Sequence, residues 1–503
     1  MTPMHLGSRA RCPVWRRGPT RGSRTAASST RARIRFPTGA PGHPADRRKE
    51  EVAKLTHEPD EIDDEEHEEV AERVAAIDVA KASGMVCIRL PREKVPGRRV
   101  TKVWQVSATT NAIMTLADEL AGLGIERVVV ESTSDYWRSF VYLLEARGLN
   151  VWLVNAQSVK QVPGRPKTDK LDAVWLAKLN ERGMLRPSFI PPIEIRQLRD
   201  YTRLRIDLTH DRTRQKERVE KLLEDALIKL SSVAADIFGV SGRAMMEALI
   251  AGERDPQALA ALAKGRMRVK RAALLEALTG RFDEHHAELL RILLDQVDAL
   301  TEKIELLSGR IEKLIEAIPA AQPPAIAPPA PDALGGDQGP LPAVERLDEI
   351  TGIGRSAAQT IIAEVGLNMA QFATAGHLVS WARLSPRTIQ SGAKSRSART
   401  GCGNPYLKGV LGEAAAAAAR TDTFLGERYR RLVKRAGKLK ALVAVARSIL
   451  VIVWHLLANP TARFRDLGAD FYVSRVNNHR KVRSLVHQLE VLLGHKVALE
   501  PAA

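Results

Sequence analysis

Between residues 70 and 180 the sequence alternates short apolar runs, many of them β-branched, with amphipathic segments. The apolar runs are RVAAIDVAK, GMVCIRLP, TKVWQVSA, IERVVVES and LNVWLVNA. Runs of this length and composition predict strands, whereas NAIMTLADELAGLG and SDYWRSFVYLLEARG have the spacing of amphipathic helices. A further helix is predicted after the last strand. The pattern therefore restricts this part of the chain to a mixed α/β domain.

The order of these elements narrows the fold further. Three strands followed by helix, strand, helix, strand and helix is the order of an RNase H-like α/β domain. In that layout the first and fourth strands are neighbours. Asp78 ends the first strand and Glu131 ends the fourth, so we expect the two carboxylates to lie side by side. The third predicted helix would face them.

That third helix begins in VPGRPKTDKLDAVWLAKL, residues 162–179. Asp169 and Asp172 lie three residues apart at its start, and residues with this spacing share a helix face. We therefore expect both carboxylates to point at one spot. The helix is predicted to rest on the core through an apolar set of four residues, Leu171, Val174, Trp175 and Leu179.

The four acids together predict a site for a divalent metal. Carboxylates held close together repel each other, and a divalent cation removes that conflict. Ligands that are all oxygen suit Mg²⁺ or Mn²⁺, which can act on a phosphodiester. Each acid also has a simpler interpretation. Asp169 and Asp172 complement a helix dipole, and Asp78 and Glu131 are ordinary polar strand ends.

A second group of polar residues lies in WARLSPRTIQSGAKSRSARTGCGNPYLKGVL, residues 381–411. Ser391 stands between Gln390 and Gly392, so its hydroxyl is predicted on an exposed turn where nearby cations could activate it and bind a phosphate. The simpler interpretation is a basic loop that contacts phosphate and in which Ser391 only forms hydrogen bonds. Cys402 is a weaker candidate nucleophile. The predicted nucleic-acid-binding residues are Arg387, Lys394, Arg396, Arg399 and Lys408.

The rest of the chain divides by composition. Residues 1–69 are predicted to be a disordered extension, first basic and then acidic, and residues 70–190 form the α/β domain. Residues 191–318 are predicted to be helical and coiled-coil, and residues 319–343 a proline-rich linker. Residues 344–460 form a mainly α-helical last domain that opens with LDEITGIGRSAAQTIIAEVG, either a helix-hairpin-helix or a plain αα-hairpin. Residues 461–503 are a helical tail.

The helical region carries a regular apolar seam with alternating spacings of three and four residues. Such a seam predicts an antiparallel hairpin or a contact between two copies of the chain. Its members are Leu290, Leu293, Val297, Leu300, Ile304, Leu307, Ile311, Leu314 and Ile318.

Charge and composition favour a nucleic-acid partner. The formal net charge is +18 and the isoelectric point is near 10.0, a balance that attracts polyanions. The three cysteines have no ligand-like spacing, which favours a reducing cytoplasm over a disulfide framework. The longest apolar run, residues 449–457, is shorter than a bilayer span, so no membrane partner is expected.

The two groups of residues together resemble the DEDD transposases of bacterial insertion sequences, the family numbered one hundred and ten. The resemblance spans about residues 70–460. It is carried by AAIDVAK, VVVEST, KTDKLDA, ITGIG and P-x-x-x-Q-S-G followed by GNPYLK. It maps the family's acidic set onto Asp78, Glu131, Asp169 and Asp172, and its serine onto Ser391.

The resemblance implies a RuvC-like first domain of the RNase H-like class, a coiled coil that mediates dimer formation, and a last domain that carries the serine. It implies that the serine links covalently to DNA while the carboxylates hold Mg²⁺. The implied partners are DNA, a guide RNA encoded by the element, and further copies of the chain in a dimer or tetramer. The implied location is the bacterial cytoplasm, at the nucleoid.

The sequence departs from the family's pattern at two positions. Arg383 stands where a glycine is expected before Leu-x-Pro, and Lys408 stands where arginine is commoner. Two other functions remain compatible with the sequence. One is a junction-resolving nuclease in which the carboxylates act with water and no covalent serine intermediate forms. The other is an inactive nucleic-acid-binding remnant of a mobile element.

Overall fold

The computed structural model describes residues 71–92, 98–132, 134–155, 168–324, 341–386, 388–391, 394–397, 400–474 and 478–497. Within these ranges, the side chains of residues 132, 388–391, 394–397, 473–474 and 478–481 are not described. The described residues fall into two compact units, the N-terminal unit (71–190) and the C-terminal unit (191–497). The predictions for residues 1–69 and for residues 325–340 of the proline-rich segment lie outside the described residues.

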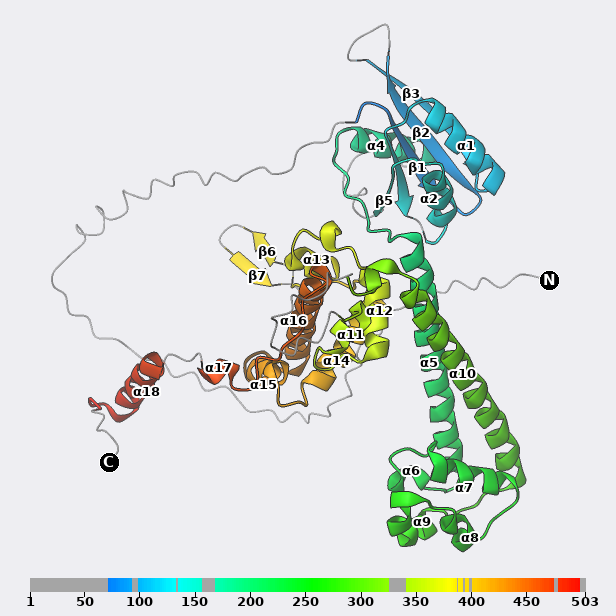
Figure 1. The fold of residues 1–503 in the computed structure, drawn as a ribbon, viewed down its shortest axis with the longest axis vertical. Coiled ribbons are helices and arrows are strands. Elements are labelled where there is room, and N and C mark those ends of the chain that lie inside the picture. The colour runs from blue at the N-terminus through cyan, green and yellow to red at the C-terminus, as the bar shows by residue number, and fades with distance from the viewer. Residues whose placement is uncertain are drawn as a thin grey trace, which may run out of the picture. The chain divides into compact units, whose positions relative to one another are not determined.

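The N-terminal unit is built on a five-stranded mixed sheet in the order β3-β2-β1-β4-β5 (Figure 1). β1 is parallel to β4, and β4 is parallel to β5. β2 is antiparallel to β1 and to β3. The first and fourth strands are therefore neighbours, as the element order predicted. The strands are β1 (Val74–Val79), β2 (Ser83–Pro91), β3 (Arg99–Ser107), β4 (Arg127–Ser132) and β5 (Val151–Asn155).

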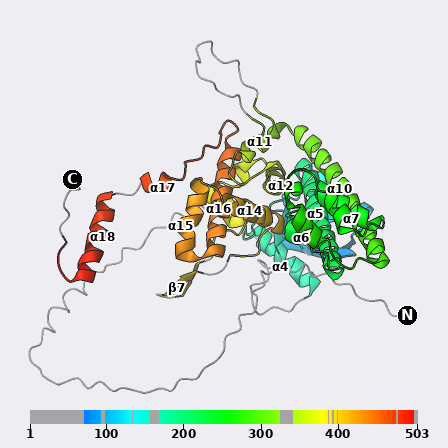
Figure 2. The ribbon, with the colours of Figure 1, turned by 90° about the horizontal axis from the view of Figure 1, so that it is seen from below.

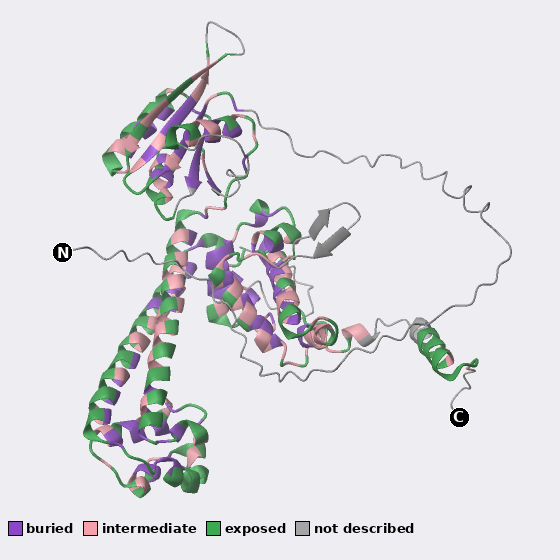
Figure 3. Cartoon of the chain, turned by 180° about the vertical axis from the view of Figure 1, so that it is seen from behind, coloured by how far each residue is buried: buried purple, intermediate pink, exposed green. Residues whose placement is uncertain are grey.

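Helices cover both faces of this sheet, and the central strands are buried between them (Figure 3). α1 (Thr110–Gly122) and α2 (Trp137–Ala146) pack on one face, and α4 (Asp169–Glu181) packs on the other. Side chains alternate between faces along a strand. Ala75 and Ile77 of β1 accordingly belong to the core under α1 and α2, whereas Ala76 belongs to the core under α4.

The C-terminal unit begins with a long helical hairpin. α5 (Ile193–Asp225) and α10 (Glu284–Glu316) pack side by side and run in opposite directions (Figures 1 and 2). Short helices between them form a cap with its own apolar core, which the sequence did not reveal. These helices are α6 (Leu230–Val233), α7 (Val240–Ile250), α8 (Pro256–Ala261), the 3₁₀ helix η1 (Gly265–Lys270) and α9 (Arg271–Ala277).

The buried face of α10 differs from the predicted seam. Leu294 and Ile315 are buried where the strict repeat placed Leu293 and Leu314. The middle of the helix is more polar, and Thr301 bonds back to the carbonyl of Val297 at 2.8 Å. An uncurved helix has 3.6 residues per turn, so a seven-residue repeat drifts around it. The buried side chains of α10 therefore follow the 3.6-residue period of the helix and not a strict seven-residue repeat.

The base of the hairpin shares one apolar core with the last helices of the unit. Leu198 of α5 and Ile311 of α10 join a cluster that continues to Leu450 of α16. Ala321 and Ala343, on either side of the proline-rich segment, are buried in the same core. The elements after the hairpin are η2 (Pro319–Ala321), α11 (Ala343–Asp348), α12 (Arg355–Val365), η3 (Met369–Gln371), α13 (Ala375–Trp381), β6 (Thr388–Ser391), β7 (Lys394–Ser397), α14 (Pro405–Ala418), α15 (Phe424–Ala436), α16 (Lys438–Ala458), α17 (Phe471–Ser474) and α18 (Asn478–Leu493).

Two of these elements settle expectations from the sequence. α16 is longer than the apolar run that the sequence analysis identified, because basic residues interrupt that run without ending the helix. By its length and hydropathy alone, α16 could cross a membrane. Its buried residues belong to the core of the C-terminal unit, and it packs against α13, α14 and α15, as expected of a core helix. The predicted tail helix is confirmed as α18.

The ITGIG turn packs against α14. Gly352 has φ +90°, and a Cβ there would come within 2.3 Å of the carbonyl oxygen of Ala414. The turn therefore packs closely against the alanine run of α14, whose small side chains allow this approach. This packing favours the plain αα-hairpin over a phosphate-binding helix-hairpin-helix.

Candidate metal centre and serine hairpin

The sheet brings Asp78 and Glu131 together. They are direct partners in the parallel register of β1 and β4. Asp78 has the same parity as Ala76, and Glu131 has the same parity as Val129, and both of these apolar residues lie under α4. Both acids therefore belong to the face that α4 covers. Glu131 is buried, with 5% of its surface exposed, and Asp78 is half-buried.

α4 begins at a capped turn. The Thr168 hydroxyl accepts a hydrogen bond from the amide of Leu171 at 3.3 Å, which satisfies one of the free amides of the first turn. Asp169 and Asp172 lie in that turn, where the helix dipole favours negative charge. The helix start thus follows from the sequence Thr-Asp-Lys-Leu-Asp.

The face that α4 buries differs from the one predicted. Leu171 is 44% exposed, and Val174 and Trp175 are only partly buried, whereas Leu179 is buried as expected. Val174 and Trp175 still pack against the core, and small and polar side chains that a search for large apolar residues does not find complete the contact. Because Asp169 lies four residues before Ala173, it shares the sheet-facing side. The residues of α4 that are buried are Ala173, Leu176, Ala177, Leu179 and Asn180.

Asn180 fixes the direction in which α4 crosses the sheet. Its side-chain amide donates to the carbonyl oxygens of Ala75 at 3.0 Å and Arg127 at 3.2 Å. These carbonyls lie near the starts of β1 and β4, so the end of α4 is tied to the starts of both strands. The first turn of α4 is therefore directed toward the strand ends that carry Asp78 and Glu131.

The usual rise per residue gives the distance from the Asn180 contact to Asp172 along α4 and to Asp78 along β1. Eight residues of helix separate Asn180 from Asp172, or about 12 Å at the usual rise. Three residues of strand separate Ala75 from Asp78, or about 10 Å. On this estimate Asp172 lies near the level of Asp78, whereas Asp169, three residues further toward the start of α4, is exposed. A set of four carboxylates offers only oxygen ligands, which fits Mg²⁺ or Mn²⁺.

The described residues contain one group of three side chains whose ligand atoms all lie within 4.8 Å of one another, and it is a different one: Asp225, His285 and His286, between α5 and α10. His286 caps its helix, because its Nδ1 accepts the backbone amide of Asp283 at 3.1 Å. A neutral imidazole has one free lone pair. Since Nδ1 uses it, Nε2 carries the proton and faces Asp225 at 3.4 Å. This arrangement opposes metal binding.

Cys87 lies on β2 in the core under α4. Burial raises the pKa of its thiol to about 11, an effect only partly offset by the charges of Arg89 and Lys178. A thiolate is the reactive form of cysteine. Cys87 is therefore an inert core residue beside the carboxylates.

Ser391 ends β6 of a short antiparallel hairpin, in which it pairs with Lys394 of β7. We call residues 388–397 the serine hairpin. The sequence had predicted a loop here, because strands of four residues are too short to show a reliable alternation. The side chains of Ser391, Arg387, Lys394, Arg396 and Arg399 lie outside the described residues.

The two segments that lead into and out of the serine hairpin, residues 382–384 and 401–404, contact each other, and we call them its roots. Arg383 has φ +56°, a conformation that favours glycine, and this is the position where a glycine was expected. Gly403 has φ +62°, and a Cβ there would lie 3.2 Å from Cβ of Arg383 and 2.6 Å from the carbonyl oxygen of Ala382. The predicted nucleic-acid ligand Lys408 also supports this root, since its Nζ donates to the carbonyl of Gly401 at 2.8 Å.

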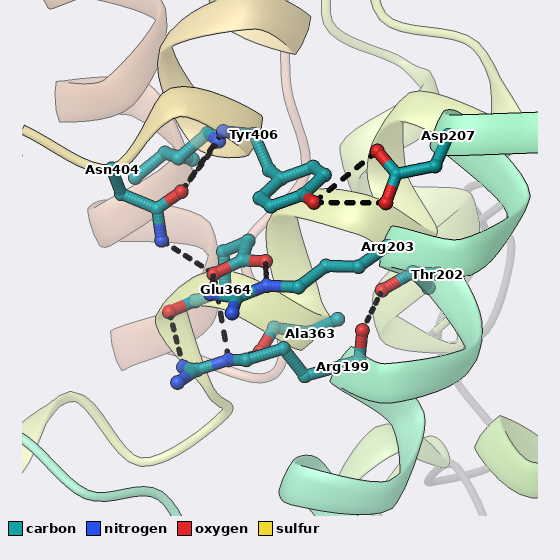
Figure 4. A network of polar contacts seen from close by, with 9 residues as sticks. Arg199, Thr202, Arg203, Asp207, Ala363, Glu364, Asn404 and Tyr406 are labelled. Atoms are coloured by element: carbon teal, nitrogen blue, oxygen red, sulfur yellow. Dashed lines mark hydrogen bonds and ion pairs between the residues drawn. The ribbon is translucent and has the colours of Figure 1, made fainter. Parts of the chain in front are cut away.

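A polar network that the sequence did not predict lies next to these roots (Figure 4). At its centre is Glu364 of α12, which is fully buried. Arg203 of α5 donates to both carboxylate oxygens of Glu364, at 2.7 and 2.8 Å, and Arg199 lies 3.4 Å from one of them. Asn404 donates its side-chain amide to the same carboxylate.

The electrostatics of this network follow from burial and pairing. Burial alone would lower the pKa of Arg203, but the hydrogen bonds and charge of Glu364 outweigh it and raise that pKa. Burial, followed by the hydrogen bond to Asp207, raises the pKa of the Tyr406 hydroxyl. Arg203 and Tyr406 therefore both keep their protons at neutral pH. No short motif signals such a network, because its members are up to 207 residues apart in the sequence, from Arg199 to Tyr406.

Exposed basic residues also gather at two other places among the described residues of the C-terminal unit. On and after α15, Arg430 is engaged by Glu427 and Asp422 at 2.8 and 2.9 Å, whereas Arg431, Lys434, Arg435 and Lys438 are exposed. The second surface was not predicted and lies in the cap of the helical hairpin. Its residues are Lys264, Arg266, Arg268, Lys270 and Arg271.

Comparison with known families gives two matches. A family model of IS110 DEDD type, described as a transposase, matches residues 75–228. A second model, described as the transposase IS116/IS110/IS902 family, matches residues 344–430. The first contains the four acids and the second contains Ser391, so each candidate centre falls inside one match. A search of the curated proteins finds no match.

Proposed function

Since the chain belongs to the IS110 family of transposases, we propose that it cuts and rejoins DNA with two centres. One is the carboxylate set of an RNase H-like, RuvC-like domain, and the other is the hydroxyl of Ser391. The observation that carries the proposal is the register of β1 and β4, which pairs Asp78 with Glu131 on the face covered by α4. Two carboxylates held this close repel each other, and a divalent cation would relieve that repulsion.

Membership of this family implies a divalent metal, and the candidate ligands are Asp78, Glu131, Asp169 and Asp172. A bound Mg²⁺ or Mn²⁺ would neutralise these carboxylates and stabilise charge on a phosphodiester. The chain's own contribution is to hold the four acids in place. The sheet fixes two of them by register, and the α4 cap and the Asn180 anchor fix the other two.

Ser391 supplies the nucleophile in this proposal. Its oxygen attacks phosphorus, the bond from phosphorus to one sugar oxygen breaks, and the serine proton and the departing oxygen recombine as a sugar hydroxyl. The DNA is then joined to the chain as a phosphoserine ester, and the reverse reaction with another sugar hydroxyl reseals it. Arg387, Lys394, Arg396, Arg399 and the root residue Lys408 would bind the phosphates, since cations beside the hydroxyl attract them.

The test uses the full chain with Mg²⁺ and a plasmid that carries the reading frame with its flanking DNA. Ser391→Ala is expected to abolish the covalent protein–DNA adduct seen on a denaturing gel. Ser395→Ala, which changes a serine on the other strand of the same hairpin, is the control and should retain the adduct. Asp78→Asn and Asp169→Asn should abolish strand cleavage. A normal adduct yield from Ser391→Ala would remove the serine from the mechanism.

The alternatives predict different products. A junction-resolving nuclease would cleave with Mg²⁺ but give no adduct, because water attacks in place of serine. An inactive remnant would bind DNA in a salt-sensitive way and cleave nothing.

The proposal extends to partners and location. A guide RNA would pair with donor and target DNA, and the protein would act in the cytoplasm at the nucleoid. Copies of the chain would associate through a coiled coil formed by the helical hairpin. Apolar side chains of α10 that are exposed in the single chain support this contact, namely Leu289, Ile292 and Leu306. Light scattering should give a dimer or tetramer, and Ile292→Glu with Leu306→Glu should lower that mass.

A further inference from the structure

We propose that Glu364 and Asn404 form an anchor that positions the serine hairpin against helix α5. The anchor acts on Ser391 from a distance, so its members are positioning residues rather than catalytic ones. This inference deepens the proposed function of Ser391 and rests on it for its effect on DNA chemistry. The anchor itself is a matter of structure, and it can be tested separately.

Glu364 is a buried charge that two cations of α5 neutralise. It has no exposed surface, Arg203 binds both of its oxygens, and Arg199 lies beside it. Arg199 also donates to the backbone carbonyls of Ala363 at 3.0 Å and Glu364 at 2.8 Å. A buried carboxylate is stable only when it is paired and hydrogen-bonded. Glu364 thus requires α5 in one position relative to α12.

Asn404 connects this carboxylate to the serine hairpin. Its side-chain oxygen accepts the backbone amides of Tyr406 at 3.0 Å and Leu407 at 3.1 Å, and so caps α14. Its side-chain nitrogen donates to Glu364. Only an amide side chain offers an acceptor and a donor at this spacing. Asn404, seven residues after the end of the hairpin, is therefore bound to α12 and to α14 at once.

Fixing Asn404 fixes both roots of the hairpin. Gly403 precedes it and packs against Ala382 and Arg383 of the incoming root. Leu384, the next residue along that root, is buried in the core of the unit. A shift of Asn404 would therefore be passed to the incoming root through this contact.

A second contact ties the same root to α5. The Tyr406 hydroxyl donates to Asp207 of α5, with the oxygens 3.1 and 3.2 Å apart. The guanidinium of Arg203 lies 4.9 Å from the centre of the Tyr406 ring. Two positive and two negative side chains thus meet, as Figure 4 shows: Arg199, Arg203, Asp207 and Glu364. Because α5 is one continuous helix, its position at the base sets the position of the serine hairpin.

The test exchanges the two members of the anchor. Asn404→Asp keeps the cap on α14 but turns a donor into a carboxylate that faces Glu364. Glu364→Gln removes the buried charge. Combining the two changes restores a donor, an acceptor and the original net charge between positions 364 and 404. The double variant should therefore recover the link between these two residues, although the glutamine of Glu364→Gln can accept from only one of the two Arg203 donors. Asn368→Asp is the matched control, because Asn368 also caps a helical turn through Ala370 but is exposed and faces no carboxylate.

The first readout does not depend on catalysis. Limited tryptic cleavage at Lys394 and Arg396 of the full chain, followed by mass spectrometry, measures how well the hairpin is held. Loss of a charged hydrogen bond should raise the cleavage rate about tenfold or more in each single variant. The double variant should return toward the wild-type rate, and Asn368→Asp should not differ from it. Equal cleavage in all five proteins would overturn the anchor.

The second readout separates the anchor from the chemistry of Ser391. DNA affinity should change little in the single variants, whereas the rate of adduct formation at saturating DNA should fall and then recover in the double variant. A merely structural role would lower affinity and rate together, without recovery on exchange. If cleavage by trypsin follows the exchange but adduct formation does not, the anchor stands and the proposed function of Ser391 fails.

Discussion

Replacing Asn180 with alanine should loosen the N-terminal unit at the junction of α4 with β1 and β4. Asn180 is 1% exposed. Its amide nitrogen donates to two backbone carbonyls, and its oxygen accepts from Nε of Arg127 at 2.7 Å. Alanine removes all three hydrogen bonds while Arg127, itself 3% exposed, stays buried.

The expected cost follows from the groups left behind. A buried polar group that loses its partner costs roughly 1–3 kcal/mol, and more when it is charged. Arg127 keeps its bond to the backbone carbonyl of residue 180 at 2.7 Å and its stacking over Trp152 at 4.2 Å, which limits the loss. We therefore expect Asn180→Ala to lower the free energy of local unfolding by about 2–4 kcal/mol.

Hydrogen exchange on the full chain measures this loss without assuming that a chain of several parts unfolds in one step. Each 1.4 kcal/mol is a factor of ten, so amides of β1, β4 and α4 should exchange about 30 to 1,000 times faster. Asn111→Ala, an exposed position in α1, is the control and should change exchange less than about threefold. A similarly small change in Asn180→Ala would refute the claim that Asn180 anchors α4.

Three further predictions use other parts of the chain. Gly403→Ala should destabilise the root of the serine hairpin by about 1–3 kcal/mol, because φ is +62° and a Cβ would lie 2.6 Å from the carbonyl of Ala382; the tryptic assay above would detect it. Leu294→Ala should cost about 2–5 kcal/mol and Leu293→Ala clearly less, since only the former is fully buried; urea unfolding followed by circular dichroism tests the order. Folding raises the pKa of Cys87 to about 11 from 9.0, so the folded chain holds its proton longer than the unfolded chain. Stability should be unaffected below pH 9 and fall between pH 9 and 11, more in wild type than in Cys87→Ala.

The sequence predicted the acid pair of the sheet better than the acids of the helix. Strand order is readable from the order of elements, and parallel neighbours bring their ends together, so Asp78 and Glu131 could be paired in advance. The contact face of α4 was predicted in part: Leu179 is buried and Val174 and Trp175 pack against the core, whereas Leu171 is exposed and the rest of the face was missed. Ala173 and Asn180 carry much of it, and neither is recognised by a search for large apolar residues. The hydrogen bonds of Asn180, not apolar area, set the direction of the helix.

For the serine hairpin, the sequence located the motif but did not show how the fold holds it. Its motif is local, so the sequence located Ser391 and the surrounding cations without the fold. The left-handed conformation of Arg383 was indicated only by the resemblance, whose pattern has a glycine there, because an arginine itself gives no sign of a positive φ. The basic turn at residues 264–271 was also missed, because its role as a cap depends on α5 and α10 packing together.

Short-range information, then, was enough to predict the five strands of the N-terminal sheet, the neighbouring ends of β1 and β4 that carry Asp78 and Glu131, and the family. The tertiary structure alone decided which residues hold the serine hairpin. Glu364 is one glutamate among many in the sequence, and it becomes a buried charge only when α5, α12 and α14 converge on it. A sequence motif shows which residues are near one another along the chain. The energy of a buried carboxylate depends instead on the groups that surround it in space.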